Sequence, residues 1–218
     1  MTTLKAKPSA HPKRRALHKR RRTAPSVWVI LIVMGVLLGG TALLLGGGGE
    51  PAGTIVADVE IVGDALPSYA RVGSDPALGT MIPEVHGSSF EGTASTIAHD
   101  GRAKAIVFLA HWCSHCRAEV PAIQGWLADG GRIPRGVDLI SVSTFVDDRR
   151  ENYPPDAWLE REGWTAPVLV DDADSSVATA FGLDGTPFWV FVDAEGRVVL
   201  RASGEIGVSA LEQVLATL

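Results

Sequence analysis

The chain has 218 residues and a formal net charge of −5, which averages two very different parts. Residues 1–49 hold nine of the 20 Lys and Arg residues and no acid, whereas the remainder has 11 Lys and Arg against 25 Asp and Glu. Such an acidic remainder argues against a nucleic-acid-binding surface, because phosphate binding needs a basic patch. The length allows about one to two domains.

The basic N-terminal part precedes an uncharged apolar stretch. Residues 1–26 carry the Lys and Arg cluster and several prolines, and we predict a cytoplasmic tail here. Residues 27–45 have no charge, and as a helix rising about 1.5 Å per residue they would nearly match the ~30 Å hydrocarbon core of a bilayer. Positive charge before this stretch and acid after it predict a single-pass membrane anchor with residues 50–218 outside the cytoplasm. The alternative is a cleaved signal peptide, whose apolar region usually runs about 7–15 residues.

Residues 46–65 begin with a glycine tract and are predicted to be a flexible linker, followed by a folded domain over residues 66–218. The hydrophobic patterning of the chain then predicts alternating strands and helices. Strands are expected near residues 54–62, 89–90, 93–98, 104–109, 138–145, 167–170, 188–192 and 197–201, and helices near residues 113–127, 156–162, 175–181 and 208–218. This alternation, with a hairpin between the last two strands, predicts an α/β fold with a mixed sheet flanked by helices.

The chain has only two cysteines, and they lie in the sequence Cys113-Ser114-His115-Cys116. Their spacing places the second thiol one helical turn beyond the first, with the two Cα atoms about 5–6 Å apart, which suits a disulfide. Cys113 is the predicted nucleophile, because the N–H groups and dipole at a helix N-terminus favour a thiolate. Cys116 is the predicted resolving thiol. A purely structural disulfide is the alternative, although so short a loop constrains little of the unfolded chain.

Other residues around the cysteines form a recognisable set. Trp112 precedes the first cysteine, Pro121 follows the second by five residues, and Gly185-Thr186-Pro187 precedes a late strand. Over about residues 80–218 the chain resembles the thioredoxin fold, and within it the membrane-anchored, extracytoplasmic TlpA/ResA-like thiol-disulfide oxidoreductases. The resemblance implies a cis bond before Pro187 and a loop that presents the backbone at Thr186 to the substrate, whereas the residues alone leave an ordinary trans proline open. Trp112 would shape the substrate groove or shield the disulfide.

Three further residues bear on the chemistry. His115, between the two cysteines, would in its protonated form stabilise the Cys113 thiolate and so make the disulfide a better oxidant; the alternative is an exposed histidine with no electrostatic role. A histidine at this place resembles the strongly oxidising DsbA-type proteins. Thioredoxins carry a buried aspartate, which moves protons for the resolving cysteine, where this chain has Val107. The residue that would accept the proton of Cys116 is therefore not identified by the resemblance. Glu119 and His111 are candidates, although we expect Glu119 to be a solvated helix residue and His111 to lie at the rim of the site.

These features predict a membrane-tethered, extracytoplasmic thiol-disulfide oxidoreductase, without a cofactor or metal, which leans towards oxidation or isomerisation. Its expected partners are exported protein thiols or disulfides and a membrane redox protein. One alternative is a reductase in cytochrome c maturation, as in some TlpA/ResA-like proteins. Another is a copper-binding chaperone that uses Cys113, Cys116, His111 and His115, since thiolate and imidazole suit Cu(I). A third is a non-catalytic scaffold with an inert disulfide.

Overall fold

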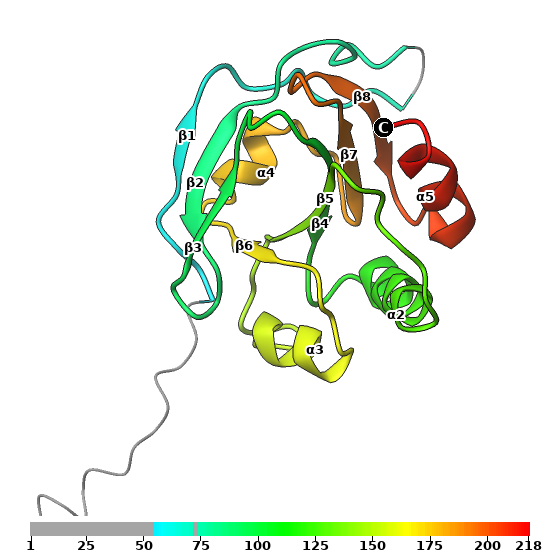
Figure 1. The fold of residues 1–218 in the computed structure, drawn as a ribbon. Coiled ribbons are helices and arrows are strands. Elements are labelled where there is room, and N and C mark those ends of the chain that lie inside the picture. Colours follow the sequence, from blue (N-terminus) through cyan, green and yellow to red (C-terminus); the bar gives the residue numbers. More distant parts are fainter. Residues whose placement is uncertain (1–54, 72–73) are drawn as a thin grey trace, which may run out of the picture. The chain divides into compact units, whose positions relative to one another are not determined.

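The computed structural model describes residues 55–71 and 74–218 (Figure 1). The predicted tail, the predicted membrane anchor of residues 27–45 and the first part of the predicted linker lie outside the described residues. Within the part that is described, no helix combines the length and the apolar character needed to cross a membrane. The tail and the anchor therefore stay predictions.

A mixed five-stranded sheet forms the centre of the fold, with the strand order β6-β5-β4-β7-β8. The strands are β4 (Ala103–Leu109), β5 (Val137–Ser143), β6 (Val168–Val170), β7 (Phe188–Val192) and β8 (Val198–Ser203). Strands β4, β5 and β6 run parallel, whereas β7 is antiparallel to β4 and forms a hairpin with β8. This arrangement confirms the predicted mixed sheet and the predicted terminal hairpin.

The central strand β4 is buried along its whole length because both faces of the sheet are covered. Ala105, Val107 and Leu109 pack into a core with helices α2 (Ser114–Ala128), α3 (Pro155–Arg161) and α5 (Gly207–Leu215). Ile106 and Phe108 point to the other face, into a second core with helix α4 (Ser176–Ala180). The β4 sequence is continuously apolar because its side chains point alternately into the two cores.

A smaller antiparallel sheet, β1-β2-β3, lies over the second core (Figure 1). Its strands are β1 (Glu60–Val62), β2 (Glu84–Ser88) and β3 (Ala94–Ile97). Residues 60–62 pair with β2, which confirms the end of the strand expected near residues 54–62. The strand expected at Ser89–Phe90 is wrong: β2 ends at Ser88, because a turn closed by Gly92 N–H donating to the Ser89 carbonyl follows. The strand predicted to reach Phe145 also ends early, at Ser143.

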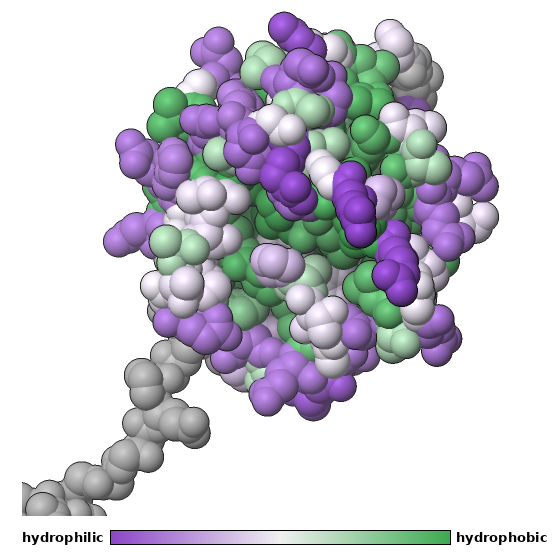
Figure 2. All heavy atoms as spheres, viewed as in Figure 1, coloured by the Kyte–Doolittle hydropathy of each residue, from purple (hydrophilic) through white to green (hydrophobic). Residues whose placement is uncertain are grey.

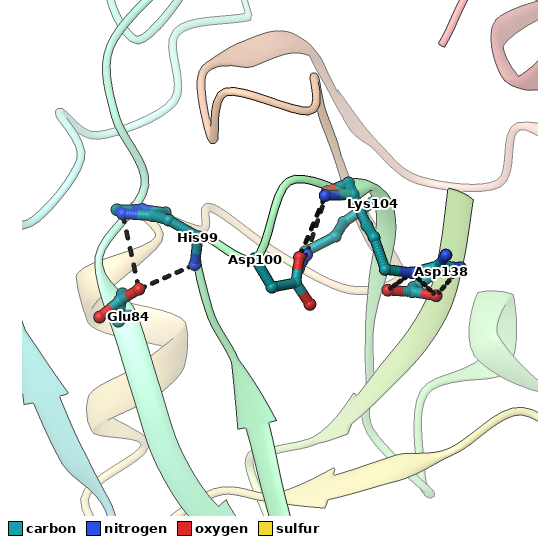
Figure 3. Close-up of polar contacts among 6 residues, drawn as sticks. Glu84, His99, Asp100, Lys104 and Asp138 are labelled. Carbon is teal, nitrogen blue, oxygen red and sulfur yellow. Dashed lines mark hydrogen bonds and ion pairs between the residues drawn. The ribbon is translucent and has the colours of Figure 1, made fainter. Parts of the chain in front are cut away.

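Charged residues stabilise the loops at the edges of the sheets. Figure 3 shows Lys104 directed at Asp100, with 2.5 Å between the ammonium nitrogen and the carboxylate, and His99 donating its backbone N–H to Glu84 at 2.8 Å. Arg102 pairs with Asp138 at 2.6 Å, which ties the start of β4 to the start of β5. On the face drawn in Figure 2, polar residues surround a hollowed centre in which apolar residues gather.

A buried ion pair attaches the segment before β2 to the main sheet. The Arg201 side chain on β8 is fully buried, and its guanidinium donates to Asp75 and to the carbonyl oxygens of Pro67 and Phe181. Asp75 also accepts the Ala77 N–H, and its pKa is lowered chiefly by the hydrogen bond from Arg201. No local pattern predicts this contact, because Asp75 and Arg201 lie 126 residues apart.

We expect Asp75→Asn to destabilise the fold by about 3 kcal/mol, because it leaves the buried guanidinium of Arg201 without a counter-charge. Urea unfolding of the full chain, followed by tryptophan fluorescence, measures the change in the free energy of unfolding. The matched control is Asp138→Asn, which breaks the more exposed pair with Arg102 and should cost less than about 1 kcal/mol. Equal effects of the two substitutions would contradict this role of Asp75.

Candidate active site

The sheet topology brings the predicted site residues to one edge. Strand β4 ends at Leu109, and Cys113 follows as the N-cap of α2. Strand β7 begins with Phe188, which lies opposite Phe108 near that end of β4, so Pro187 comes beside the cysteines. Two chain segments more than seventy residues apart therefore meet at the start of α2.

Cys113 is close to the surface, with 9% of the residue exposed, and both cysteines are free thiols in this structure. Its sulfur lies 3.1 Å from the Thr186 carbonyl oxygen, to which the thiol donates. The pKa of Cys113 is lowered to about 5, first by a hydrogen bond from the Cys116 thiol and then by the backbone N–H groups of Cys116 and His115. A pKa of about 5 favours the thiolate form of Cys113 at neutral pH.

Cys116 differs from Cys113 because it has no exposed surface. Burial, followed by the hydrogen bond with Cys113, raises the pKa of Cys116 far above that of a free thiol. The Ala110 N–H points at its sulfur from 3.5 Å. The two thiols are thus chemically unequal: the pKa of Cys113 is lowered near the surface, whereas the pKa of Cys116 is raised in the core.

The peptide bond between Thr186 and Pro187 is cis, as the resemblance implied. The loop is held from its other side, where the Pro187 carbonyl accepts the Gly204 N–H at 2.8 Å. The Thr186 carbonyl therefore faces Cys113 from a fixed position. The backbone before β7 thus lies directly beside Cys113.

His115 is exposed and forms an ion pair that the sequence did not reveal. Its Nδ1 lies 2.5 Å from the Glu205 carboxylate, which follows β8. The hydrogen bond to Glu205 raises the pKa of His115, and the nearby Cys113 contributes a smaller effect of the same sign. Glu205 thus favours the protonated form of the histidine that lies between the two cysteines.

Glu119 is buried, and the expectation of a solvated helix residue is wrong. Its carboxylate accepts hydrogen bonds from the Trp189 ring at 3.0 Å and from the N–H groups of Ile206 and Gly207 at 3.1 and 3.2 Å. The sequence did contain a signal, because Glu119 follows Cys116 by three residues and falls on the same helical face, which is the buried face of α2. The free-energy cost of burying the Glu119 side chain is offset by the three N–H groups that donate to it.

His111 is also buried, so its expected position at the rim is wrong. Its Nδ1–H donates to the Glu151 carbonyl at 2.8 Å, and its Nε2 accepts the Asp147 N–H at 3.3 Å. Burial lowers the pKa of His111, which agrees with this neutral tautomer. Both nitrogens are occupied, so His111 is not free to join the cysteines in the copper site considered above. In residues 55–71 and 74–218, no cluster of three or more His, Cys, Asp or Glu could hold a metal.

The remaining predicted residue, Trp112, directly precedes Cys113 and contacts the segment after β5. Its ring N–H donates to the Phe145 carbonyl at 2.7 Å, and the Arg150 guanidinium stacks 4.5 Å from the ring centroid. Val107, the position of the missing aspartate, is an apolar core residue. The structure therefore brings Trp112, Cys113, His115, Cys116, Thr186 and Pro187 together.

This fold and this pair of thiols define a thioredoxin-like domain with a Cys-x-x-Cys site. A comparison with protein families matches residues 78–201 to the AhpC/TSA family. The chain belongs to that family.

Individual proteins are also similar to this chain. Thiol:disulfide interchange protein HelX of Rhodobacter capsulatus is 28% identical over 108 residues, which cover 49% of this chain and 55% of HelX. The chain thus matches about half the length of that relative. A DsbF homologue from Corynebacterium diphtheriae superposes with a TM-score of 0.56 at 17% identity, over 71% of this chain and 99% of that one. A putative thiol:disulfide interchange protein DsbE from Chlorobium tepidum superposes with a TM-score of 0.52 at 19% identity. This match covers 64% of this chain and 96% of that one. The two structures support the fold.

We expect Cys113 to react with iodoacetamide at a rate that is nearly constant from pH 6 to pH 8 and falls to half near pH 5, because only the thiolate is alkylated. Mass spectrometry of the reduced chain at each pH locates the label. Cys116 should stay unlabelled across this range, since it is buried and protonated. A midpoint near the ordinary thiol pKa of about 8.5 would contradict the assigned thiolate.

Proposed function

We propose that this protein is a thiol-disulfide oxidoreductase in which Cys113 is the nucleophile and Cys116 the resolving thiol. The observation that carries the proposal is the difference in pKa between the two thiols. Exchange needs one thiolate that attacks the substrate and a second thiol that reacts only afterwards. A purely structural disulfide would need neither property. A scaffold role is disfavoured for the same reason.

The exchange follows from this geometry. The Cys113 thiolate attacks one sulfur of a substrate disulfide, so that a Cys113–substrate bond forms while the substrate S–S bond breaks and its other sulfur leaves as a thiolate. Cys116 then loses its proton and attacks the Cys113 sulfur, which forms the Cys113–Cys116 disulfide and releases the second substrate thiolate. Two electrons pass from the domain to the substrate. The reverse sequence oxidises a substrate dithiol.

Other residues support these steps. The Thr186 backbone and Pro187 would align the substrate cysteine at the Cys113 sulfur, and Trp112 would border the groove. For the proton that Cys116 must lose, we infer that Glu119 is the acceptor, because it is a buried carboxylate on the same face of α2. His111 is not suited to this task, since its accepting nitrogen already binds the Asp147 N–H.

For the direction of electron flow, we infer oxidation or isomerisation. A Cys113 pKa of about 5 lies between the thiols of thioredoxin, near 7, and of DsbA, near 3.5, and a stabilised thiolate stabilises the reduced form. Glu205 favours the protonated form of His115 near that thiolate, and its own carboxylate offsets part of the positive charge. A reductase in cytochrome c maturation is the alternative.

We also infer that residues 27–45 anchor the protein in the cell membrane, with the thioredoxin-like domain outside the cytoplasm. Support comes from the uncharged apolar stretch and its basic N-terminal flank. Disulfides persist in such a compartment. The expected partners are then exported proteins with thiols or disulfides and a membrane protein that restores the redox state of Cys113 and Cys116.

We expect Cys116→Ala to accumulate mixed disulfides at Cys113, because the resolving thiol is gone while the nucleophile remains. Denaturing, non-reducing electrophoresis of cells that express the full chain, followed by mass spectrometry of the adducts, identifies the trapped proteins. Cys113→Ala is the matched control and should trap none. Absence of adducts would count against the exchange function, and adducts made only of cytoplasmic proteins would contradict the membrane orientation.

The reduction potential of the Cys113–Cys116 pair should be about −200 mV or higher, because the Cys113 thiolate is favoured in the reduced form. Equilibration of the full chain with glutathione buffers, read by tryptophan fluorescence, gives the value. A potential near that of thioredoxin, about −270 mV, would overturn the oxidising direction and favour the reductase alternative.

A further inference from the structure

An open cleft of about 580 Å³ lies directly beside the nucleophile. Its walls come from two elements, the start of α2 and the loop after β5, because β4 and β5 run parallel and end at the same edge of the sheet. The lining residues are Trp112, Cys113, Ser114, Arg117, Arg149, Arg150 and Glu151. Three arginines thus surround the approach to Cys113, and a cleft of this size accepts a ligand of a few residues.

Arg150 is the arginine that is best placed to bind a ligand. Its guanidinium stacks on Trp112, whose ring is itself fixed by its hydrogen bond to the Phe145 carbonyl. Stacking uses the face of a guanidinium and leaves the N–H groups at its edge to donate elsewhere. Among the described residues, no carboxylate forms an ion pair with Arg150. The nearby Asp147, whose pKa is lowered first by Arg149 and further by the charge of Arg150, offsets part of that charge.

The two other arginines add positive charge that is only partly neutralised. Arg117 pairs with Glu151 at 2.8 Å, but its Nε–H is buried and has no partner in the described part of the chain. Arg149 pairs with Asp147 at 3.0 Å. The lining residues thus include three arginines and the carboxylate of Glu151, while Asp147, which pairs with Arg149, lies outside the lining.

The loop that carries Arg149 and Arg150 is attached firmly to the segment before Cys113. His111 binds the Glu151 carbonyl and the Asp147 N–H, and the Asn152 amide donates to the His111 carbonyl at 3.2 Å. A binding group held in place loses less conformational entropy when a ligand arrives. The arginines are thus positioned by the same residues that introduce the nucleophile.

We propose that this cleft binds a carboxylate that the substrate carries next to its reacting cysteine, so that the preferred substrates are peptide segments with Asp or Glu beside the cysteine. The inference rests on the proposed thiol-disulfide exchange. An Arg guanidinium binds a carboxylate through two parallel N–H donors, and Arg150 has its donors available. Binding there holds the substrate sulfur at Cys113 while the peptide backbone meets Thr186 from the other side.

Three disulfide-linked peptide dimers test the preference, with glutamate, glutamine or lysine on both sides of a single cysteine. The reduced full chain reacts with each at low ionic strength, and quenched samples separated by chromatography give second-order rate constants. Each rate constant is divided by that of mercaptoethanol with the same peptide, because flanking charge alters the reactivity of the peptide itself. We expect the glutamate peptide to react about fivefold faster than the glutamine peptide, as for one exposed arginine–carboxylate pair, and the lysine peptide to react slowest.

Variants assign the effect to the cleft. Arg150→Gln should reduce the glutamate preference to less than about twofold, and 1 M salt should do the same through screening. The matched control is Arg135→Gln, which removes the same charge from the loop before β5, at the opposite end of the sheet, and should preserve the preference. Equal rates for the glutamate and glutamine peptides, or a preference that survives Arg150→Gln, would overturn the proposal. Failure of all three peptides to react would instead overturn the exchange function on which it rests.

Discussion

Burial of β4 on both faces is the constraint on which the rest of the structure depends. Its side chains alternate between the core under α2 and the core under α4, so the strand has to lie in the middle of the sheet. Parallel pairing with β5 and antiparallel pairing with β7 then bring the loop after β5 and the cis-proline loop to the end of β4. The chain leaves β4 there and enters α2 through Cys113. The position of the nucleophile is thus a consequence of the sheet order.

The chemistry of the site depends on a difference in environment between two identical side chains. Cys113 lies where backbone N–H groups converge and the thiolate is stabilised, whereas Cys116 lies one turn further inside and is cut off from water. Desolvation opposes charge in the second thiol more strongly than in the first. Glu119, which lies beyond Cys116 on the same helical face, keeps a carboxylate in this apolar interior through hydrogen bonds from Trp189 and the start of α5.

Recognition and reaction use different parts of the chain. The reacting sulfur and its charge partner His115 belong to the turn into α2, whereas Arg150 is on the loop after β5 and Glu205 follows β8. These loops are free to vary in charge without disturbing the sheet, because they extend from its edge. A shared thioredoxin-like fold can therefore serve substrates of different charge, and in this chain the arginines favour acidic ones.

The sequence by itself determined the strands of the central sheet, the helices and the two thiols, since these depend on local hydrophobic patterns and on the spacing of Cys113 and Cys116. It also indicated the loop at Pro187. It did not reveal that Glu119 is buried, because polarity predicts exposure unless the donors that satisfy the carboxylate are known, and these come from β7 and α5. Glu205 and Arg150 were missed for a related reason. Only tertiary structure decided which distant charges face the nucleophile, because such contacts depend on strand order and have no period in the sequence.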